Sequence, residues 1–271
     1  MANFSVDHRL PTWRRIALST WRRGDDPTIY GWLDLDATEL LAYVQRVRER
    51  SGVRITVTHV VGKAAAMAFA AHPECNGVVS LGRLKRRDTI DVFFQVAFDG
   101  GKGLSGAKVD RADGLTVAQI AGALEAQAAR IRQKKDTALQ RSQGILHRVP
   151  GVLMGTVLRV TEALTYDAGI DLSSVGIPFD PFGTVMVTNV GVFGIEHGFA
   201  PLLPVSRIAA LLTVGAVRDA VIAVNGEAVV RPVISIGGTF DHRVIDGHGL
   251  GQLSGVIRKI LTDPARELGE P

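Results

Sequence analysis

The stretch GGTFDHRVIDGHG, residues 237–249, decides how this chain folds and where its chemistry is to be sought. It joins an apolar run to the start of an amphipathic helix, and it sets His242 and Asp246 four positions apart. The surrounding glycines suit a tight strand-to-helix turn, and they equally leave room for a ligand to approach the backbone. Because the spacing HxxxDG is short, it is a weak signal alone. Its meaning depends on the rest of the chain.

The sequence predicts several strands before this turn and a helix after it. The helix is expected from about Asp246 to Leu261, because its apolar residues recur at steps of three and four. The segments that predict strands are GTVMVTNVG at 183–191, RIAALLTVGAV at 207–217, AVIAV at 220–224 and EAVVRPVISIGGTF at 227–240.

The first half of the chain adds helices and a hairpin. Helices are expected to begin near Pro11 and after Asp36, where Asp36 and Glu39 have capping-box spacing, and to cover residues 56–73 and about 116–133. Residues 28–36 are expected to be extended, and residues 89–99 and 102–109 to form a hairpin through Gly100 and Gly101. The sequence therefore predicts one α/β domain over 1–271, an α+β two-layer sandwich with helices flanking a mixed sheet.

Composition excludes several classes of protein. The 271 residues carry 31 Lys and Arg interleaved with 27 Asp and Glu, and this net charge of +4 does not single out a nucleic-acid partner. The tightest basic cluster, residues 83–87, is interpreted as a solvated turn before a strand, with a site for an anionic phosphate ligand as the alternative. No apolar window is long enough to span a bilayer, so no membrane partner is expected. The single cysteine, Cys75, excludes an intrachain disulfide and favours a reducing, cytoplasmic location.

Histidine suits proton transfer, because its ordinary pKa of about 6.5 lets it take and return a proton near neutral pH. The helix N-terminus would keep the Asp246 carboxylate ionised, and a nearby carboxylate can fix the tautomer of an imidazole. None of the other six histidines has metal-ligand spacing, so no metal site is expected. Structural or surface roles are favoured for His8, His59, His72 and His147, and a solvated position for His248.

The wider sequence resembles a known family. TFDHRVIDG resembles the motif DHRxxDG in the catalytic domain of the dihydrolipoamide acyltransferases of 2-oxo-acid dehydrogenase complexes, whose fold is shared with chloramphenicol acetyltransferase. The segments GTVMVTNVGVFGIEHGFAPLLP at 183–204 and LLTVGAVRDAVIAVNGEAVVRPVISIGGTFDHRVIDG at 211–247 continue the similarity. Earlier, RRIALSTWRR, VTHVVGKAAAMAFAAHPECN and LTVAQIAGALEAQAARIR resemble the family's helices in the same order.

The resemblance implies an activity and assigns residues to it. His242 would be the base that deprotonates the thiol of coenzyme A or dihydrolipoamide, and Thr188, where the family has serine, would donate to the oxyanion of the tetrahedral intermediate. Asp246 would have an electrostatic and structural role in the site. Asn189, Gly191, His197, Arg243 and Gly247 are candidates to border the substrate, although for Arg243 holding the loop is favoured and for His197 the choice is open.

The resemblance also implies a homotrimer in which His242 and Thr188 of a site come from neighbouring chains. Coenzyme A would be a substrate, no cofactor would be tightly bound, and any lipoyl group would come from another protein, because the family's lipoyl domain is not seen ahead of this region. The terminal sequence PARELGEP predicts no assembly beyond the trimer.

Two alternatives stay open. The protein could be a non-catalytic trimeric core of such a complex, or an acyltransferase to a small-molecule hydroxyl or amine. The family-atypical longer segment at about 134–182 is expected to form one or two amphipathic helices, as extra core or, less favoured, as a changed acyl pocket or a docking face.

Overall fold

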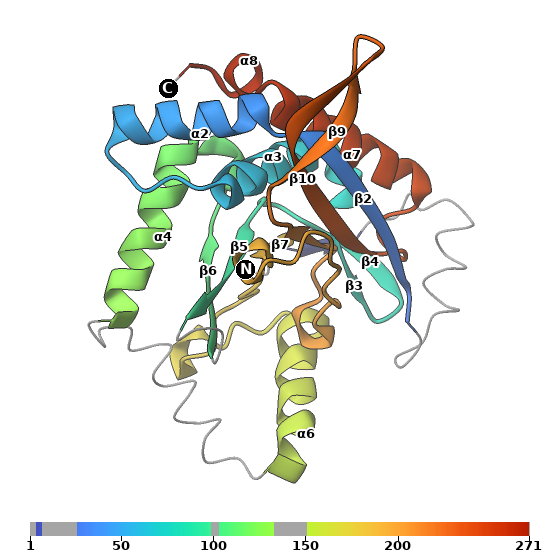
Figure 1. Ribbon diagram of the computed structural model, residues 1–271. Coiled ribbons are helices and arrows are strands. Elements are labelled where there is room, and N and C mark those ends of the chain that lie inside the picture. Colours follow the sequence, from blue (N-terminus) through green and yellow to red (C-terminus); the bar gives the residue numbers. More distant parts are fainter. Residues whose placement is uncertain (1–3, 7–25, 99–102, 133–150, 271) are drawn as a thin grey trace.

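A computed structural model describes residues 4–6, 26–98, 103–132 and 151–270 of the protein (Figure 1). Its centre is a mixed sheet with the strand order β2-β10-β8-β7-β5-β6, and β9 pairs with β10 beside this path. The neighbours β5–β7 and β7–β8 are parallel, and the other neighbours are antiparallel. The bounds of these strands are β2 Thr28–Asp36, β5 Val92–Phe98, β6 Gly103–Val109, β7 Val185–Asn189, β8 Ala210–Val214, β9 Arg218–Val224 and β10 Glu227–Asp241.

Helices cover one face of this sheet. Successive side chains of a strand point to opposite faces of the sheet. On the helical face, Val187 of β7, Leu212 of β8 and Ile236 of β10 join the main apolar core with helical residues such as Ile120 and Leu253. In Figure 1, α7 runs behind β2 and β10 and α4 stands beside β6. The helices of this layer are α2 Thr38–Ser51, α3 Val57–Ala71, α4 Val117–Arg132 and α7 Gly247–Thr262, which the short helix α8 Pro264–Leu268 follows.

The strands and helices predicted from the sequence are confirmed where the structure describes them. The helix expected near Pro11 and the turn at Gly100 and Gly101 lie outside the described residues. Among the helices of the described ranges, none is long and apolar enough to cross a membrane. A smaller antiparallel sheet with the order β1-β4-β3 completes the strands: β1 Phe4–Val6, β3 Gly77–Ser80 and β4 Arg83–Arg87.

The capping box predicted at Asp36 and Glu39 is wrong. Asp36 still belongs to β2, where it pairs with Val233, and the residue before α2 is Ala37. The Asp36 carboxylate accepts from the backbone N–H of Thr38 at 2.9 Å and so fixes the strand-to-helix turn. A capping box does form at α3, where the backbone N–H of Thr56 donates to Nδ1 of His59 at 3.0 Å.

The basic cluster at 83–87 is not a solvated turn. It forms strand β4, and the Arg87 side chain is buried, with Nε 2.8 Å from Oδ2 of Asp180. Nη1 of Arg87 donates to the carbonyl oxygen of Gly77 at 2.9 Å. Spacing along the chain gave no sign of this ion pair, because its partner lies far away in sequence.

The segment predicted as atypical contains one projecting helix, α6 Gly151–Glu162, and a single π-helical turn, Ala163–Asp167 (Figure 1). Its residues 134–150 lie outside the described part. The buried Tyr166 hydroxyl donates to Oδ1 of Asp180 at 2.8 Å, and Nε of Arg207 donates to Oε1 of Glu162 at 2.7 Å. Burial and the Asp180 carboxylate raise the pKa of Tyr166, so its hydroxyl stays protonated. The turn thus adds to the buried interior.

Candidate active site

His242 lies in the turn between β10 and α7. The side chain of Asp241 stabilises this turn through hydrogen bonds. The Asp241 carboxylate accepts from the backbone N–H of Arg243 at 2.9 Å, and Nη2 of Arg243 lies 2.7 Å from its other oxygen. Val244 and Ile245 are buried and anchor the turn in the core. These contacts join Arg243 to Asp241 within the turn, while the role of Arg243 toward a substrate stays a prediction.

The histidine itself is fixed at both its backbone and its ring. Its N–H donates to the carbonyl oxygen of Pro27 at 2.8 Å, and Nδ1 lies 3.1 Å from the carbonyl oxygen of Ile245. A carbonyl oxygen only accepts, so the contact places the ring proton on Nδ1 and leaves the lone pair on Nε2. The half-buried His242 is thus held in the tautomer that can take a proton through Nε2.

Asp246 caps the helix that follows. Its Oδ1 accepts from the backbone N–H of Gly249 at 2.8 Å, as an N-cap residue does. Gly249 is packed so tightly that an added Cβ would come 3.1 Å from Sγ of Cys75. Gly247 and His248 are exposed in the first turn of α7. Asp246 therefore fixes the start of α7 and with it the turn that carries His242.

Thr188 lies near the end of β7, in register with Gln95 of β5 and Thr213 of β8. The next residue, Asn189, donates its side-chain amide to Oγ1 of Thr58 in α3 at 2.9 Å. The side-chain oxygen of Asn189 also accepts from the backbone N–H of Val192 at 3.3 Å. One side chain thus ties the strand end to the helical layer and to the turn that follows.

Gly191 completes this turn, and no other residue fits there. A Cβ at Gly191 would lie 2.6 Å from the backbone N of Ala216 and from the backbone O of Gly215. Asn189 and Gly191 therefore act here through packing and hydrogen bonds that fix the place of Thr188. Their contact with a substrate stays a prediction.

Within one chain, the structure does not bring His242 and Thr188 together. Thr188 is level with Thr213, and Thr213 is level with Gly237 of β10, whereas His242 follows the far end of β10. Five residues of strand separate Gly237 from His242, roughly 15 Å along the strands, and two strand spacings add about 10 Å across them. The two candidate groups lie at opposite ends of the sheet.

The loop after Gly191 lies directly on the sheet face that the helices leave uncovered. Cβ atoms at Gly215 and Gly237 would clash with the carbonyl oxygens of Glu196 and Gly198. Nε2 of His197 lies 3.3 Å from Oδ1 of Asp34 in β2, and both side chains are nearly half exposed. His197 thus holds the loop against β2, while its contact with a substrate stays a prediction.

Two further histidines, His59 and His72, lie in the part of the chain that the structure describes. Burial, aided by the charge of Arg54, lowers the pKa of His59 to about 4, so this ring is neutral at the start of α3. Nδ1 of His72 contacts Oε1 of Glu74 at 3.3 Å. His8 and His147 lie outside the described residues. Sequence reasoning missed Thr58 and the carbonyl oxygens of Pro27 and Ile245, because no local pattern marks such contacts.

The mixed sheet backed by one layer of helices has the chloramphenicol-acetyltransferase-like fold, and His242 and Thr188 lie at the ends of two of its strands. Chloramphenicol acetyltransferase itself aligns over 95% of this chain and 99% of its own, with a TM-score of 0.52 and 14% identity. The probable dihydrolipoamide acetyltransferase of Listeria monocytogenes 4b F2365 aligns over 94% of both chains, with a TM-score of 0.64 and 18% identity.

The sequence shows to which family with this fold the chain belongs. The family model of the 2-oxoacid dehydrogenases acyltransferase (catalytic domain) matches residues 20–145 and 182–268, and the chain belongs to that family. A curated relative, the dihydrolipoyllysine-residue acetyltransferase component of the acetoin cleaving system of Bacillus subtilis, is 24% identical over 217 residues. That alignment covers 80% of this chain and 44% of the relative, so the chain spans less than half of the relative's length.

Proposed function

We propose that this protein is a coenzyme A-dependent acyltransferase that moves an acyl group between coenzyme A and dihydrolipoamide or another acceptor. The observation that carries the proposal is the contact between Nδ1 of His242 and the Ile245 carbonyl oxygen at 3.1 Å. It orients Nε2 as the proton acceptor in a turn that hydrogen bonds of Asp241 and Asp246 hold in place. A thiol with a pKa of about 8.5 is little ionised at neutral pH, so a positioned base promotes its attack.

The steps follow from these groups. Nε2 of His242 takes the proton of the acceptor thiol, and the thiolate attacks the carbonyl carbon of the acyl thioester. The resulting oxyanion accepts a hydrogen bond from the hydroxyl of Thr188. When the tetrahedral intermediate collapses, the carbon–sulfur bond to the first thiol breaks and the leaving thiolate takes the proton back from the imidazolium. In this scheme Asp246 and Arg243 hold the turn and transfer no proton.

The reaction centre needs two copies of the chain, because His242 and Thr188 lie at opposite ends of the sheet. We propose a homotrimer in which each site combines His242 of one copy with Thr188 of the next. Support comes from large apolar side chains that are exposed on β2 and in the loop that follows β7, on the sheet face opposite the helices: Tyr30, Trp32, Val192, Phe193, Ile195, Phe199 and Leu203 are 44–67% exposed. Contact with a second copy would cover them.

The partners and the location are part of the proposal. Coenzyme A and its acyl esters would be substrates, no cofactor would be tightly bound, and a lipoyl group would be presented by a lipoyl-bearing domain. Within the described residues, no cluster of His, Cys, Asp and Glu side chains could hold a metal ion. The buried thiol of Cys75 is compatible with the cytoplasmic location proposed for the chain.

The experiment is acyl exchange between acetyl-CoA and dihydrolipoamide, with free coenzyme A separated and quantified chromatographically. His242→Ala should lower the rate by at least about a hundredfold. His248→Ala, which changes an exposed histidine six residues away, is the matched control and should leave the rate unchanged. Wild-type protein that releases no coenzyme A with any of a panel of acyl esters and thiol, hydroxyl or amine acceptors would contradict the proposal and favour a non-catalytic core.

A further inference from the structure

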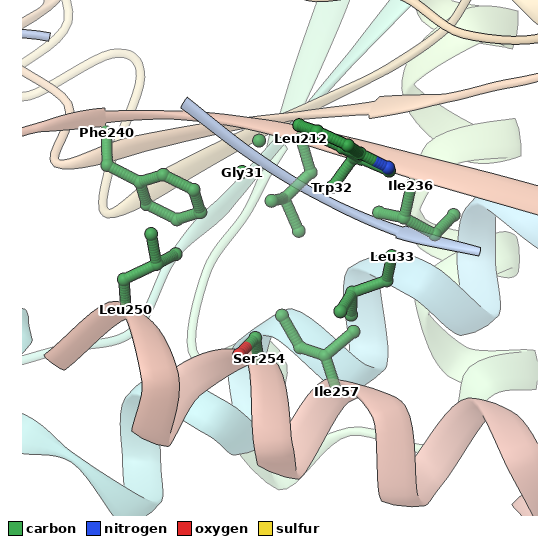
Figure 2. Close-up of a pocket in the computed structure, with 10 residues that line it drawn as sticks. Gly31, Trp32, Leu33, Leu212, Ile236, Phe240, Leu250, Ser254 and Ile257 are labelled. Atoms are coloured by element: carbon green, nitrogen blue, oxygen red, sulfur yellow. The ribbon is translucent and has the colours of Figure 1, made fainter. Parts of the chain in front are cut away.

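A cavity of about 180 Å³ lies between α7 and the strands β2 and β10, on the helical face of the sheet (Figure 2). Phe240 and Leu250 stand at one end, and Ile236 and Ile257 stand at the other. The cavity is separate from the face where Thr188 lies, and the acyl-transfer scheme makes no use of it.

The space exists because two glycines face each other across the strands. Gly31 of β2 pairs in register with Gly238 of β10, so two side chains are missing beside α7. At Gly238 the ring of Phe240 occupies the room, 2.5 Å from where a Cβ would be. At Gly31 a Cβ would meet only the Leu250 side chain, at 3.4 Å, and the backbone there is not left-handed. Neither backbone strain nor a backbone clash requires glycine at position 31.

The chemistry of the walls restricts what can bind. The side chains that line the cavity are apolar apart from the hydroxyl of Ser254 and the indole nitrogen of Trp32, and none of them is charged. The Ser254 hydroxyl already donates to the carbonyl oxygen of Gly251 at 3.0 Å, so toward the cavity it can only accept. A dry apolar cavity of about 150 Å³ holds a benzene molecule, so this one has room for a group of similar size.

Access is from the edge of the sheet. Leu33, Leu250 and Ser254 are half-buried, whereas Leu212 and Gly238 beneath them are buried. Since β2 is the terminal strand of the sheet order, the cavity opens between β2 and α7. A ligand there would contact Leu250, one turn after Asp246, and would join α7 to the sheet.

We propose that this cavity is a binding site for a small uncharged hydrocarbon group of about six carbons, an aromatic ring or a short alkyl chain. Binding would stabilise the packing of α7 on β2 and β10, since the ligand makes apolar contacts beside Gly31 that the protein alone does not make. The site is independent of the acyl-transfer function.

The test uses the complete chain with benzene as the probe, followed by ligand-observed NMR and by the midpoint of thermal unfolding. Wild-type protein should bind benzene saturably and unfold at a higher temperature when benzene is present. Ser254→Leu fills the cavity and should weaken binding at least about tenfold. Gly255→Ala is the matched control on the same helix, where an added Cβ meets open space, and it should bind as wild type does.

A second and smaller substitution tests the cavity in case the Ser254→Leu variant fails to fold. Gly31→Ala adds one methyl group at the cavity wall and should also weaken the binding of benzene. If wild-type protein shows no saturable binding, or if the folded Gly31→Ala and Ser254→Leu variants bind benzene as wild type does, the proposal is overturned. Benzoate, which has the same ring with a charge, should not compete.

Discussion

Asn189 and Thr58 join the end of β7 to the first turn of α3 through one hydrogen bond of 2.9 Å between the side-chain amide and the hydroxyl. Thr188, the proposed oxyanion donor, is the residue before Asn189. The position of a hydroxyl at a strand end is therefore set from a helix more than a hundred residues earlier in the chain.

Removing the Thr58 hydroxyl tests this relationship. Thr58→Val keeps the shape of the side chain but leaves Asn189 without this acceptor, so the strand end gains freedom. We expect kcat to fall about tenfold while the KM for the acyl ester stays nearly constant, because the oxyanion forms only in the transition state. Thr58→Ser, which keeps the hydroxyl, should have a kcat close to that of the wild-type protein. A fall in thermal stability with kcat unchanged would show that the contact serves stability alone.

Mixed assemblies test whether a site is shared between copies. Chains carrying His242→Ala and chains carrying Thr188→Ala, each with its own affinity tag, are co-expressed and purified through both tags. Either variant alone should lose at least about a hundredfold in acyl exchange. The mixed assembly should recover part of the rate, because some sites combine an intact His242 with an intact Thr188. Mixed assemblies as inactive as the single variants would contradict a shared site.

Asp246 offers a prediction about stability. Asp246→Ala removes the acceptor for the N–H of Gly249 and should lower the free energy of unfolding by about 1 kcal/mol, measured by urea denaturation. Asp246→Asn keeps an acceptor oxygen and should cost only a few tenths of that. If Asp246→Asn folds normally but abolishes acyl exchange as His242→Ala does, the structural role assigned to Asp246 is wrong.

His59 predicts how stability depends on pH. Its pKa is about 4 in the folded protein and about 6.5 in the unfolded chain, so above pH 6.5 it is neutral in both. As the pH falls from 6.5 to 4, the unfolded chain binds a proton that the folded protein does not, and the free energy of unfolding falls by up to about 3 kcal/mol. His59→Gln keeps an acceptor for Thr56 and should flatten this dependence, whereas His248→Gln should not. Equal slopes for both variants would assign the dependence to other groups.

The main sheet and its helices could be predicted from the sequence because each rests on a local pattern. Apolar residues at steps of three and four marked α7, and the DHRVIDG turn marked the place where a strand gives way to that helix. The error at Asp36 came from the same kind of reasoning, since capping-box spacing does not show where a strand ends.

Long-range contacts could not be predicted in this way. Arg87 and Asp180 lie 93 residues apart, and only the folded chain shows that the basic cluster includes a buried ion pair. The candidate residues His242 and Thr188 were found by motif, but their placement at opposite ends of the sheet depends on the strand order. The cavity beside Gly31 likewise depends on the register of two strands distant in sequence.

The placement of His242 and Thr188 has an arithmetic consequence for any assembly that completes its sites between neighbours. An open row of copies leaves one histidine unused at one end and one hydroxyl unused at the other, so it holds one reaction centre fewer than it has chains. Closing the row into a ring recovers the missing centre. Turnover per chain would then decline on dilution, because rings dissociate into single chains. A single chain carries both His242 and Thr188 but holds no complete reaction centre.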